Sequence, residues 1–155
     1  RETLRPAVLG AWNVQSPRFI AQHEIAFEAG GRRYESGALN APGNVGMAAS
    51  IQLLLDIGIE PIASRLCDLH SQFLKKLRSL GYERYLPEMP DDATTGIITV
   101  RHPSADLPAL YDQLTAANIT ASLRHDRAGA ALLRFSPHFY NTVEEFEQVI
   151  AILKG

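Results

Sequence analysis

The stretch Leu132–Phe146, which reads LLRFSPHFYNTVEEF, decides the fold of this 155-residue chain. It predicts a strand that ends at Ser136-Pro137 and leads through a tight corner into the last helix. Leu133 and Phe135 would point to one side of the strand and Arg134 to the other, because side chains alternate along a strand. One face of the strand is therefore expected to pack against the core, while the other carries a guanidinium group.

The helix that follows the corner has its own start signal. Thr142 and Glu145 fit a capping box, in which a hydroxyl and a carboxylate bind the first free amides of a helix. Apolar residues then recur at helical spacing, at Val143, Phe146, Val149, Ile150 and Leu153. The sequence thus predicts a C-terminal helix with one buried face.

Arg134 is the first candidate for a binding role. Its five fixed donors suit a carboxylate, which the guanidinium can hold through two parallel hydrogen bonds. Taken alone, an arginine on a strand is more commonly a solvated or ion-paired structural residue. The run RFSPHFYNTVEEFEQVI, residues 134–150, however, resembles the closing segment of class V aminotransferases. These pyridoxal-phosphate enzymes include cysteine desulfurases, selenocysteine lyases, kynureninases and isopenicillin epimerases. The resemblance implies that Arg134 binds the α-carboxylate of an amino-acid substrate.

A second stretch resembles the same family. Residues 33–40 read RYESGALN and precede Ala41-Pro42-Gly43 and an apolar helix. The resemblance implies a loop that crosses a dimer interface and binds the cofactor phosphate of the neighbouring subunit. Ala38 stands where the family has a threonine, and a lost hydrogen bond to a charged group is worth about 1.5–3 kcal/mol. The donors that would remain are Ser36, the amide of Gly37 and Asn40. Without the resemblance, these residues would be an ordinary connection before a helix.

The remaining pattern gives an α+β fold. A helical pair is expected at residues 44–57, with Asn44 as N-cap, and from Pro61 to Leu80. The later elements are, in order, a strand at 96–100, a helix capped by Ser104 and ending at Asn118, a strand at 119–124, the Arg134 strand and the C-terminal helix. This order predicts a small, largely antiparallel sheet with helices packed on one face.

We divide the chain by its composition. Residues 1–43 are expected to be a loop-rich lead-in, with the interface and phosphate loop at 32–43, and residues 44–155 a C-terminal small domain. The helix at 44–57 is apolar around most of its circumference, so we expect it to need cover from a larger protein.

Bulk composition excludes several classes of function. A net charge of −2 and a pI near 6.2 provide no basic surface for nucleic acid or an anionic membrane. No apolar run is long enough to span a bilayer, and no pair of histidines has the spacing of metal ligands, so no metal site is expected. A single cysteine, Cys67, fits a reducing compartment, and we expect the protein in the cytoplasm. We expect Cys67 itself to be a semi-buried apolar residue.

The lysines limit what the chain does alone. A pyridoxal-phosphate enzyme needs a lysine for its Schiff base, but Lys75, Lys76 and Lys154 lie on helical segments without the family's serine- and histidine-containing motif. We therefore expect pyridoxal 5'-phosphate to be bound covalently by an absent N-terminal large domain. On this interpretation the chain, which begins with arginine, is an inactive fragment of a homodimeric enzyme. Residues 123–132 also lack the cysteine of a cysteine desulfurase, which argues against persulfide chemistry.

Two alternatives need no lysine. A stand-alone α+β regulatory or small-ligand-binding module would bind a small anion with the same sheet face. A purely structural dimerisation domain would place no ligand against Arg134 or the loop at 36–40. An amino acid should bind to the isolated regulatory module but not to half of an active site.

Overall fold

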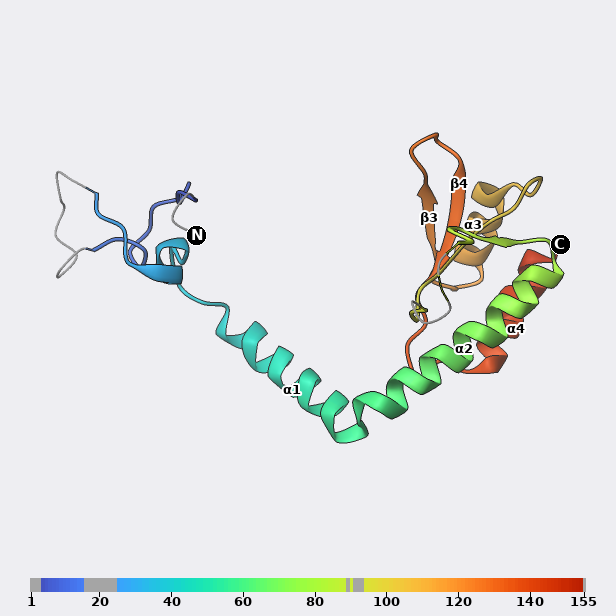
Figure 1. Ribbon diagram of the computed structural model, residues 1–155, viewed down its shortest axis with the longest axis horizontal. Coiled ribbons are helices and arrows are strands. Elements are labelled where there is room, and N and C mark those ends of the chain that lie inside the picture. Colours follow the sequence, from blue (N-terminus) through green and yellow to red (C-terminus); the bar gives the residue numbers. More distant parts are fainter. Residues whose placement is uncertain (1–3, 16–24, 89, 91–93, 155) are drawn as a thin grey trace. The chain divides into compact units, whose positions relative to one another are not determined.

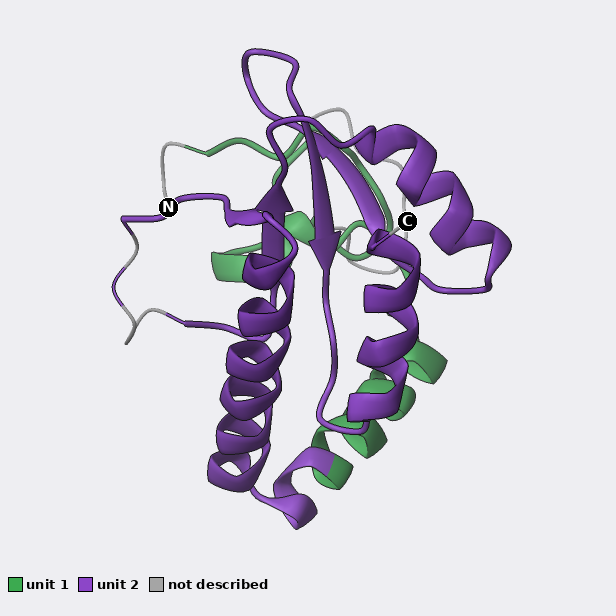
Figure 2. Ribbon diagram, turned by 90° about the vertical axis from the view of Figure 1, so that its right-hand side faces the viewer, with its two compact units in different colours: residues 1–53 green, residues 54–155 purple. Residues whose placement is uncertain are grey.

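A computed structural model describes residues 4–15, 25–88, 90 and 94–154. Its contacts divide the chain into two units, residues 1–53 and 54–155 (Figure 2). The division falls inside helix α1 (Ala41–Ile57), so the domain boundary expected after residue 43 stays a prediction. We describe the two units separately.

The first unit is held together by a buried asparagine. Asn13 is only 1% exposed, and its side-chain amide donates to the carbonyl oxygens of Val8 at 2.7 Å and Arg33 at 3.1 Å. Its Oδ1 accepts a hydrogen bond from the amide of Gly10. The described part of the lead-in is mostly loop, as the sequence predicts, with one β-bridge and the 3-10 helix η2 (Gly30–Tyr34). Buried polar groups therefore fix a segment with little apolar core.

Helix α1 begins three residues earlier than expected. Asn40, and not Asn44, takes the N-cap role, because its Oδ1 accepts a hydrogen bond from the amide of Gly43 at 3.0 Å. Pro42, which has no amide hydrogen, fits the first turn. A Cβ atom at residue 43 would lie 2.4 Å from Nδ2 of Asn40, so the cap depends on glycine there. No residue of α1 is buried.

The second unit contains the sheet and three further helices (Figure 1). The elements in chain order are α2 (Ile59–Ser79), β1 (Glu83–Arg84), β2 (Ile98–Arg101), α3 (Leu107–Ala116), β3 (Ser122–His125), β4 (Ala131–Phe135) and α4 (Val143–Leu153). The strands lie in the order β1-β2-β4-β3, and each neighbouring pair is antiparallel. The α+β class and the antiparallel sheet predicted from the sequence are confirmed.

Some boundaries differ for physical reasons. Asp106, and not Ser104, caps α3, since its Oδ1 accepts from the amide of Ala109 at 3.0 Å. Strand β1 was not expected, and its two residues pair with β2. The capping box of Thr142 and Glu145 is present as predicted and starts α4.

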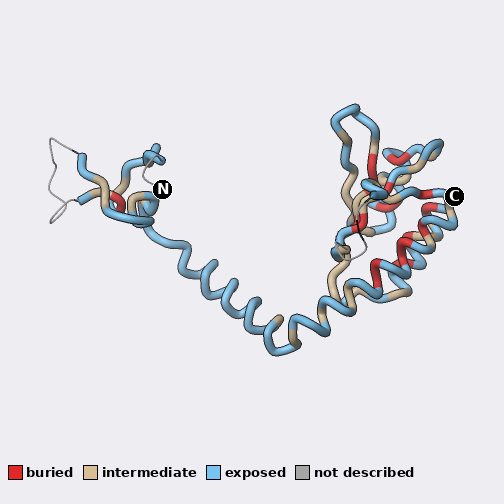
Figure 3. The backbone as a smooth tube through the Cα atoms, in the orientation of Figure 1, coloured by how far each residue is buried: buried red, intermediate tan, exposed pale blue. Residues whose placement is uncertain are grey.

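The core lies between the sheet and the helices. Phe73 of α2 is fully buried, stacks on Phe146 of α4 at 4.5 Å and meets Phe135 of β4 edge-on at 5.2 Å. Buried positions follow one side of α2 and α4 and the middle of the sheet (Figure 3). Leu133 and Phe135 belong to this cluster, as the alternation predicts, while Leu132 is also buried but lies outside it.

Within the described residues, no single helix is long and apolar enough to cross a membrane. The pair α1 and α2, broken between Ile57 and Ile59, meets the length and composition criteria only when taken together.

Candidate functional site

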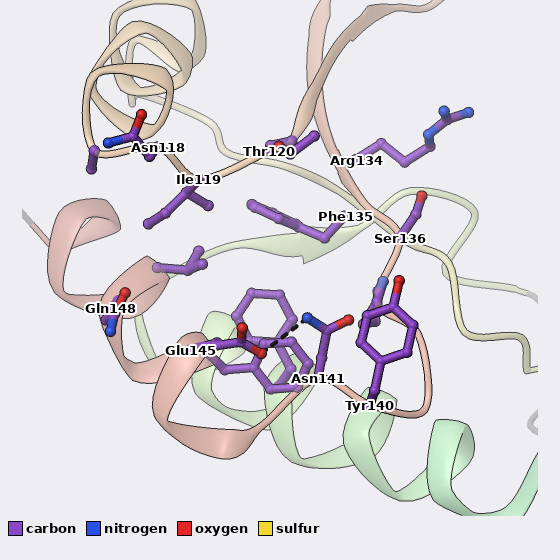
Figure 4. Close-up of a pocket in the computed structure, with 16 residues that line it drawn as sticks. Asn118, Ile119, Thr120, Arg134, Phe135, Ser136, Tyr140, Asn141, Glu145 and Gln148 are labelled. Carbon is purple, nitrogen blue, oxygen red and sulfur yellow. Dashed lines mark hydrogen bonds between the residues drawn. The ribbon is translucent and has the colours of Figure 1, made fainter. Parts of the chain in front are cut away.

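Arg134 sits on an interior strand whose backbone is fixed on both sides. In the antiparallel register it lies opposite Thr99 of β2 and Ser122 of β3. Its side chain is half-buried and lines a cavity of about 400 Å³ together with the corner after β4 and the first turns of α4 (Figure 4). The strand therefore delivers Arg134 to a cavity bounded by residues distant in sequence.

The guanidinium group of Arg134 has no ion pair or hydrogen bond within the described residues, and its Nε is buried without a partner. The acidic residue that lines the same cavity, Glu145, is already engaged. Its Oε2 accepts from the amide of Thr142 at 2.8 Å and from Nδ2 of Asn141 at 3.0 Å. Figure 4 shows the Arg134 side chain extending away from Glu145. A buried, unpaired donor is costly, so the cavity is suited to an anionic ligand.

The corner between β4 and α4 is rigidly organised by Asn141. Its Oδ1 accepts from the amide of His138 at 2.7 Å, and its carbonyl oxygen accepts from Nη2 of Arg65 at 3.1 Å. The His138 ring stacks on Tyr140, whose ring lines the cavity, with centroids 4.8 Å apart. Tyr140 and Asn141 were not predicted as site residues. Their position in the short segment between Pro137 and the Thr142 cap was the signal that could have indicated them.

The two acids at the start of α4 are held as carboxylates. The amide of Thr142 and then the side chain of Asn141 lower the pKa of Glu145, since hydrogen bonds to the charged form favour it. The pKa of Glu144 is also lowered, first by a bond from its own backbone amide and then by the Thr142 side chain. These groups stabilise the helix start and have no proton to offer at neutral pH.

The predicted phosphate-binding residues share one loop of the first unit. Ser36 is half-buried, whereas Gly37 and Asn40 are exposed. Because Oδ1 of Asn40 caps α1, the amide nitrogen is the group of this side chain that remains to donate. Nε of Arg33, which precedes the loop, is buried without a partner. Ser36, Gly37 and Asn40 thus lie on one loop of the first unit, and Arg134 lies in the second unit.

Pyridoxal 5'-phosphate, the cofactor that the sequence resemblance implies, needs donors for its phosphate and an amine for its aldehyde. The hydroxyl of Ser36, the amide of Gly37 and Nδ2 of Asn40 are donors of the kind that bind a phosphate. No lysine lines the Arg134 cavity. Lys76 forms an ion pair with Glu147, and Lys75 and Lys154 are exposed. The loop thus has donors of the kind that a phosphate requires, while the described residues that line the Arg134 cavity provide no amine for an aldehyde.

Two other sequence expectations can be compared with the structure. Cys67 is exposed on α2, so the prediction that it is semi-buried is wrong. It lies at helical spacing before the buried His70 and Leu74, at the exposed N-terminal side of this stripe. Across the parts of the chain that the structure describes, no group of three His, Cys, Asp or Glu side chains is arranged to hold a metal ion.

Comparison with known proteins identifies relatives for nearly the whole chain. The family model described as aminotransferase class-V matches residues 1–149. A probable cysteine desulfurase of Xylella fastidiosa is 29% identical over 127 residues, which cover 78% of this chain and 30% of that protein. The chain therefore spans about a third of the length of this relative.

Solved structures share the fold. The apo structure of cysteine desulfurase from Thermococcus onnurineus has a TM-score of 0.82 at 20% identity, covering 99% of this chain and 39% of the other. A C-DES mutant with glycine covalently linked to its pyridoxal-phosphate cofactor has a TM-score of 0.72 at 20% identity, covering 96% and 37%.

Proposed function

Since the chain belongs to the class V aminotransferase family, we propose that it is the C-terminal part of a pyridoxal-phosphate enzyme that acts on an amino acid. In this proposal Arg134 binds the substrate carboxylate, and Ser36, Gly37 and Asn40 bind the cofactor phosphate. The supporting observation is the unpaired guanidinium of Arg134, whose buried Nε faces no acceptor although a carboxylate lines the same cavity.

The residues of this chain bind and orient the substrate. A carboxylate that accepts two hydrogen bonds from Arg134 is fixed in both position and plane. The rigid corner at Asn141 and the Tyr140 ring bound the cavity beside it. When bound, pyridoxal phosphate supplies the electron sink that makes bonds to the α-carbon labile. Fixing the carboxylate decides which of those bonds is presented for reaction.

We propose a transaminase, epimerase or lyase that does not form a persulfide on this chain. The relative from Xylella fastidiosa carries the name cysteine desulfurase. Here, residues 123–132 hold no cysteine, and Cys67 does not line the Arg134 cavity. A persulfide on the protein needs a cysteine thiol within reach of the substrate sulfur. Neither residues 123–132 nor Cys67 provides one at the Arg134 cavity.

The proposed assembly has two further parts. A large N-terminal domain would hold the cofactor through a lysine, and it would also cover the apolar surface of α1. A second subunit would receive the loop at 36–40, which makes the enzyme a homodimer. The single cysteine is consistent with a cytoplasmic protein.

The test replaces Arg134 by lysine in the complete protein. Lysine keeps the charge but cannot form two parallel bonds to a carboxylate, so amino-acid affinity should fall about tenfold or more while the cofactor absorption spectrum stays unchanged. Arg127→Lys, an exposed position outside the cavity, is the matched control. Unchanged substrate affinity in Arg134→Lys would refute the assignment, and binding of an amino acid by the isolated chain would favour a regulatory module.

A further inference from the structure

A second cavity of the same unit has no role in the proposed function. It has a volume of about 560 Å³ and lies beside α2, where β1 passes. We call it the α2–β1 groove. The lining side chains that matter here are Cys67, His70, Lys75, Arg78, Arg84 and Thr94. Among the described residues, none lines both this groove and the Arg134 cavity.

The described residues that line the groove gather positive charge. Lys75 and Arg78 come from α2, and Arg84 comes from β1. Within the described residues no carboxylate lines the groove, and none of these three side chains has an ion pair or hydrogen bond. Neighbouring cations do find partners, since Lys76 forms an ion pair with Glu147 and Arg101 of the adjacent strand β2 pairs with Glu83 at 2.9 Å. Within the described residues, the three groove cations thus keep their donors unpaired.

A buried histidine lies among these cations. His70 is 5% exposed, and its Nδ1 lies 2.7 Å from the carbonyl oxygen of Thr95. Because a carbonyl oxygen only accepts, Nδ1 carries the hydrogen, and Nε2 of the neutral ring is an acceptor. Burial lowers the pKa of His70, and the positive charges of Arg84 and Arg78 lower it further against the opposing Thr95 bond. The charges of both guanidinium groups thus act on the His70 ring.

We propose that the α2–β1 groove binds a small phosphate-bearing anion. Two arginines and a lysine provide forked and single donors for phosphate oxygens. Nε2 of His70 can accept from a hydroxyl of the same ligand. Thr94, in the segment before β2, adds a hydroxyl-bearing side chain to the lining. The volume lies within the range of about 300–1,000 Å³ that is typical of small-molecule sites, so it accommodates more than a single phosphate group.

Two lining residues of the groove, His70 and Cys67, report ligand binding in the test. Inorganic phosphate and glucose 6-phosphate are titrated separately at constant ionic strength, with glucose and potassium chloride as controls. Binding is measured by the NMR resonances of the His70 ring and by the rate of Cys67 alkylation, determined by peptide mass. We expect saturable shifts and saturable protection with a phosphate probe. Tighter binding of glucose 6-phosphate would identify an organic phosphate, and tighter binding of phosphate would identify the inorganic anion.

Charge variants make the test specific. Arg84→Gln and Arg78→Gln should each weaken binding about tenfold, the effect expected for losing one charged hydrogen bond. Arg127→Gln removes the same charge from an exposed position outside the groove and should change nothing. The absence of saturable binding with either phosphate would overturn the proposal. An equal loss in Arg127→Gln would do the same, because it would reduce the effect to net charge.

Discussion

The backbone of Gly10 lies directly against Ser36. A Cβ atom at residue 10 would lie 1.7 Å from the Ser36 carbonyl oxygen, a distance that atoms cannot adopt without movement of the backbone. The adjacent turn is tied down, since the amide of Gly10 donates to Oδ1 of Asn13 at 2.9 Å. The position of the proposed phosphate loop is therefore set by a glycine 26 residues earlier in the sequence.

Gly10→Ala should displace Ser36 and disturb the loop at 36–40. We expect a loss of affinity for pyridoxal phosphate in the complete enzyme, measured by titration of the apo form and absorption of the bound cofactor. Gly31→Ala is the matched control, since a Cβ atom there meets nothing within 4 Å. Equal cofactor affinity in both variants would separate the Ser36 loop from phosphate binding.

Phe73→Ala should destabilise the second unit strongly. The ring is fully buried between Phe135 and Phe146, and truncating such a residue costs about 3–5 kcal/mol in the free energy of unfolding. Denaturant unfolding followed by circular dichroism measures this change. Val45→Ala, at a side chain that is 71% exposed, should change stability by less than about 1 kcal/mol. A small effect at Phe73 would contradict the core described here.

Thr142→Ala should weaken the start of α4. The Thr142 hydroxyl accepts from the amide of Glu145 at 3.3 Å, and loss of a threonine N-cap costs about 1 kcal/mol. Thr142→Ser retains the hydroxyl and should recover most of the stability. Hydrogen exchange at the amide of Glu145 provides a local measurement, which should become faster in the alanine variant alone.

Acid should destabilise the fold through His70. Its pKa is lowered in the folded protein from the ordinary value of 6.5, first by burial. The unfolded chain therefore takes up a proton at a higher pH than the folded chain does. The contribution of His70 to stability should be constant well above pH 6.5 and should fall as the pH decreases through 6.5 toward the folded pKa of His70. Unfolding measured between pH 5 and 8, about the range in which histidine titrates, should show this slope.

His70→Asn removes the titration and keeps a donor where Nδ1 meets the Thr95 carbonyl oxygen. The slope attributed to His70 should disappear in this variant. His125→Asn, at an exposed residue of β3, controls for the loss of a histidine and should leave the slope in place. Persistence of the full slope in His70→Asn would assign it to other groups.

Local signals allowed much of the second unit to be predicted. The capping box at Thr142 and Glu145 and the apolar spacing of α2 involve residues within a few turns, so neighbouring residues were enough to predict these elements. The alternation around Arg134 correctly placed Leu133 and Phe135 in the core. Asn44 and Ser104 were wrong as caps because several polar residues compete near each helix start. Backbone geometry selects among them, and here it selected Asn40 and Asp106.

The sequence by itself determined the α+β class, the last helix and Arg134 as the candidate ligand-binding residue. Only the tertiary structure decided what surrounds these residues. Strand β1 exists because its two residues pair with β2. The guanidinium of Arg134 is unpaired within the described residues because its side chain extends away from Glu145, the carboxylate that lines the same cavity. The α2–β1 groove likewise joins Lys75 and Arg78 to Arg84 across a turn. Each of these facts depends on distances between elements, which folding sets and residue order alone does not contain.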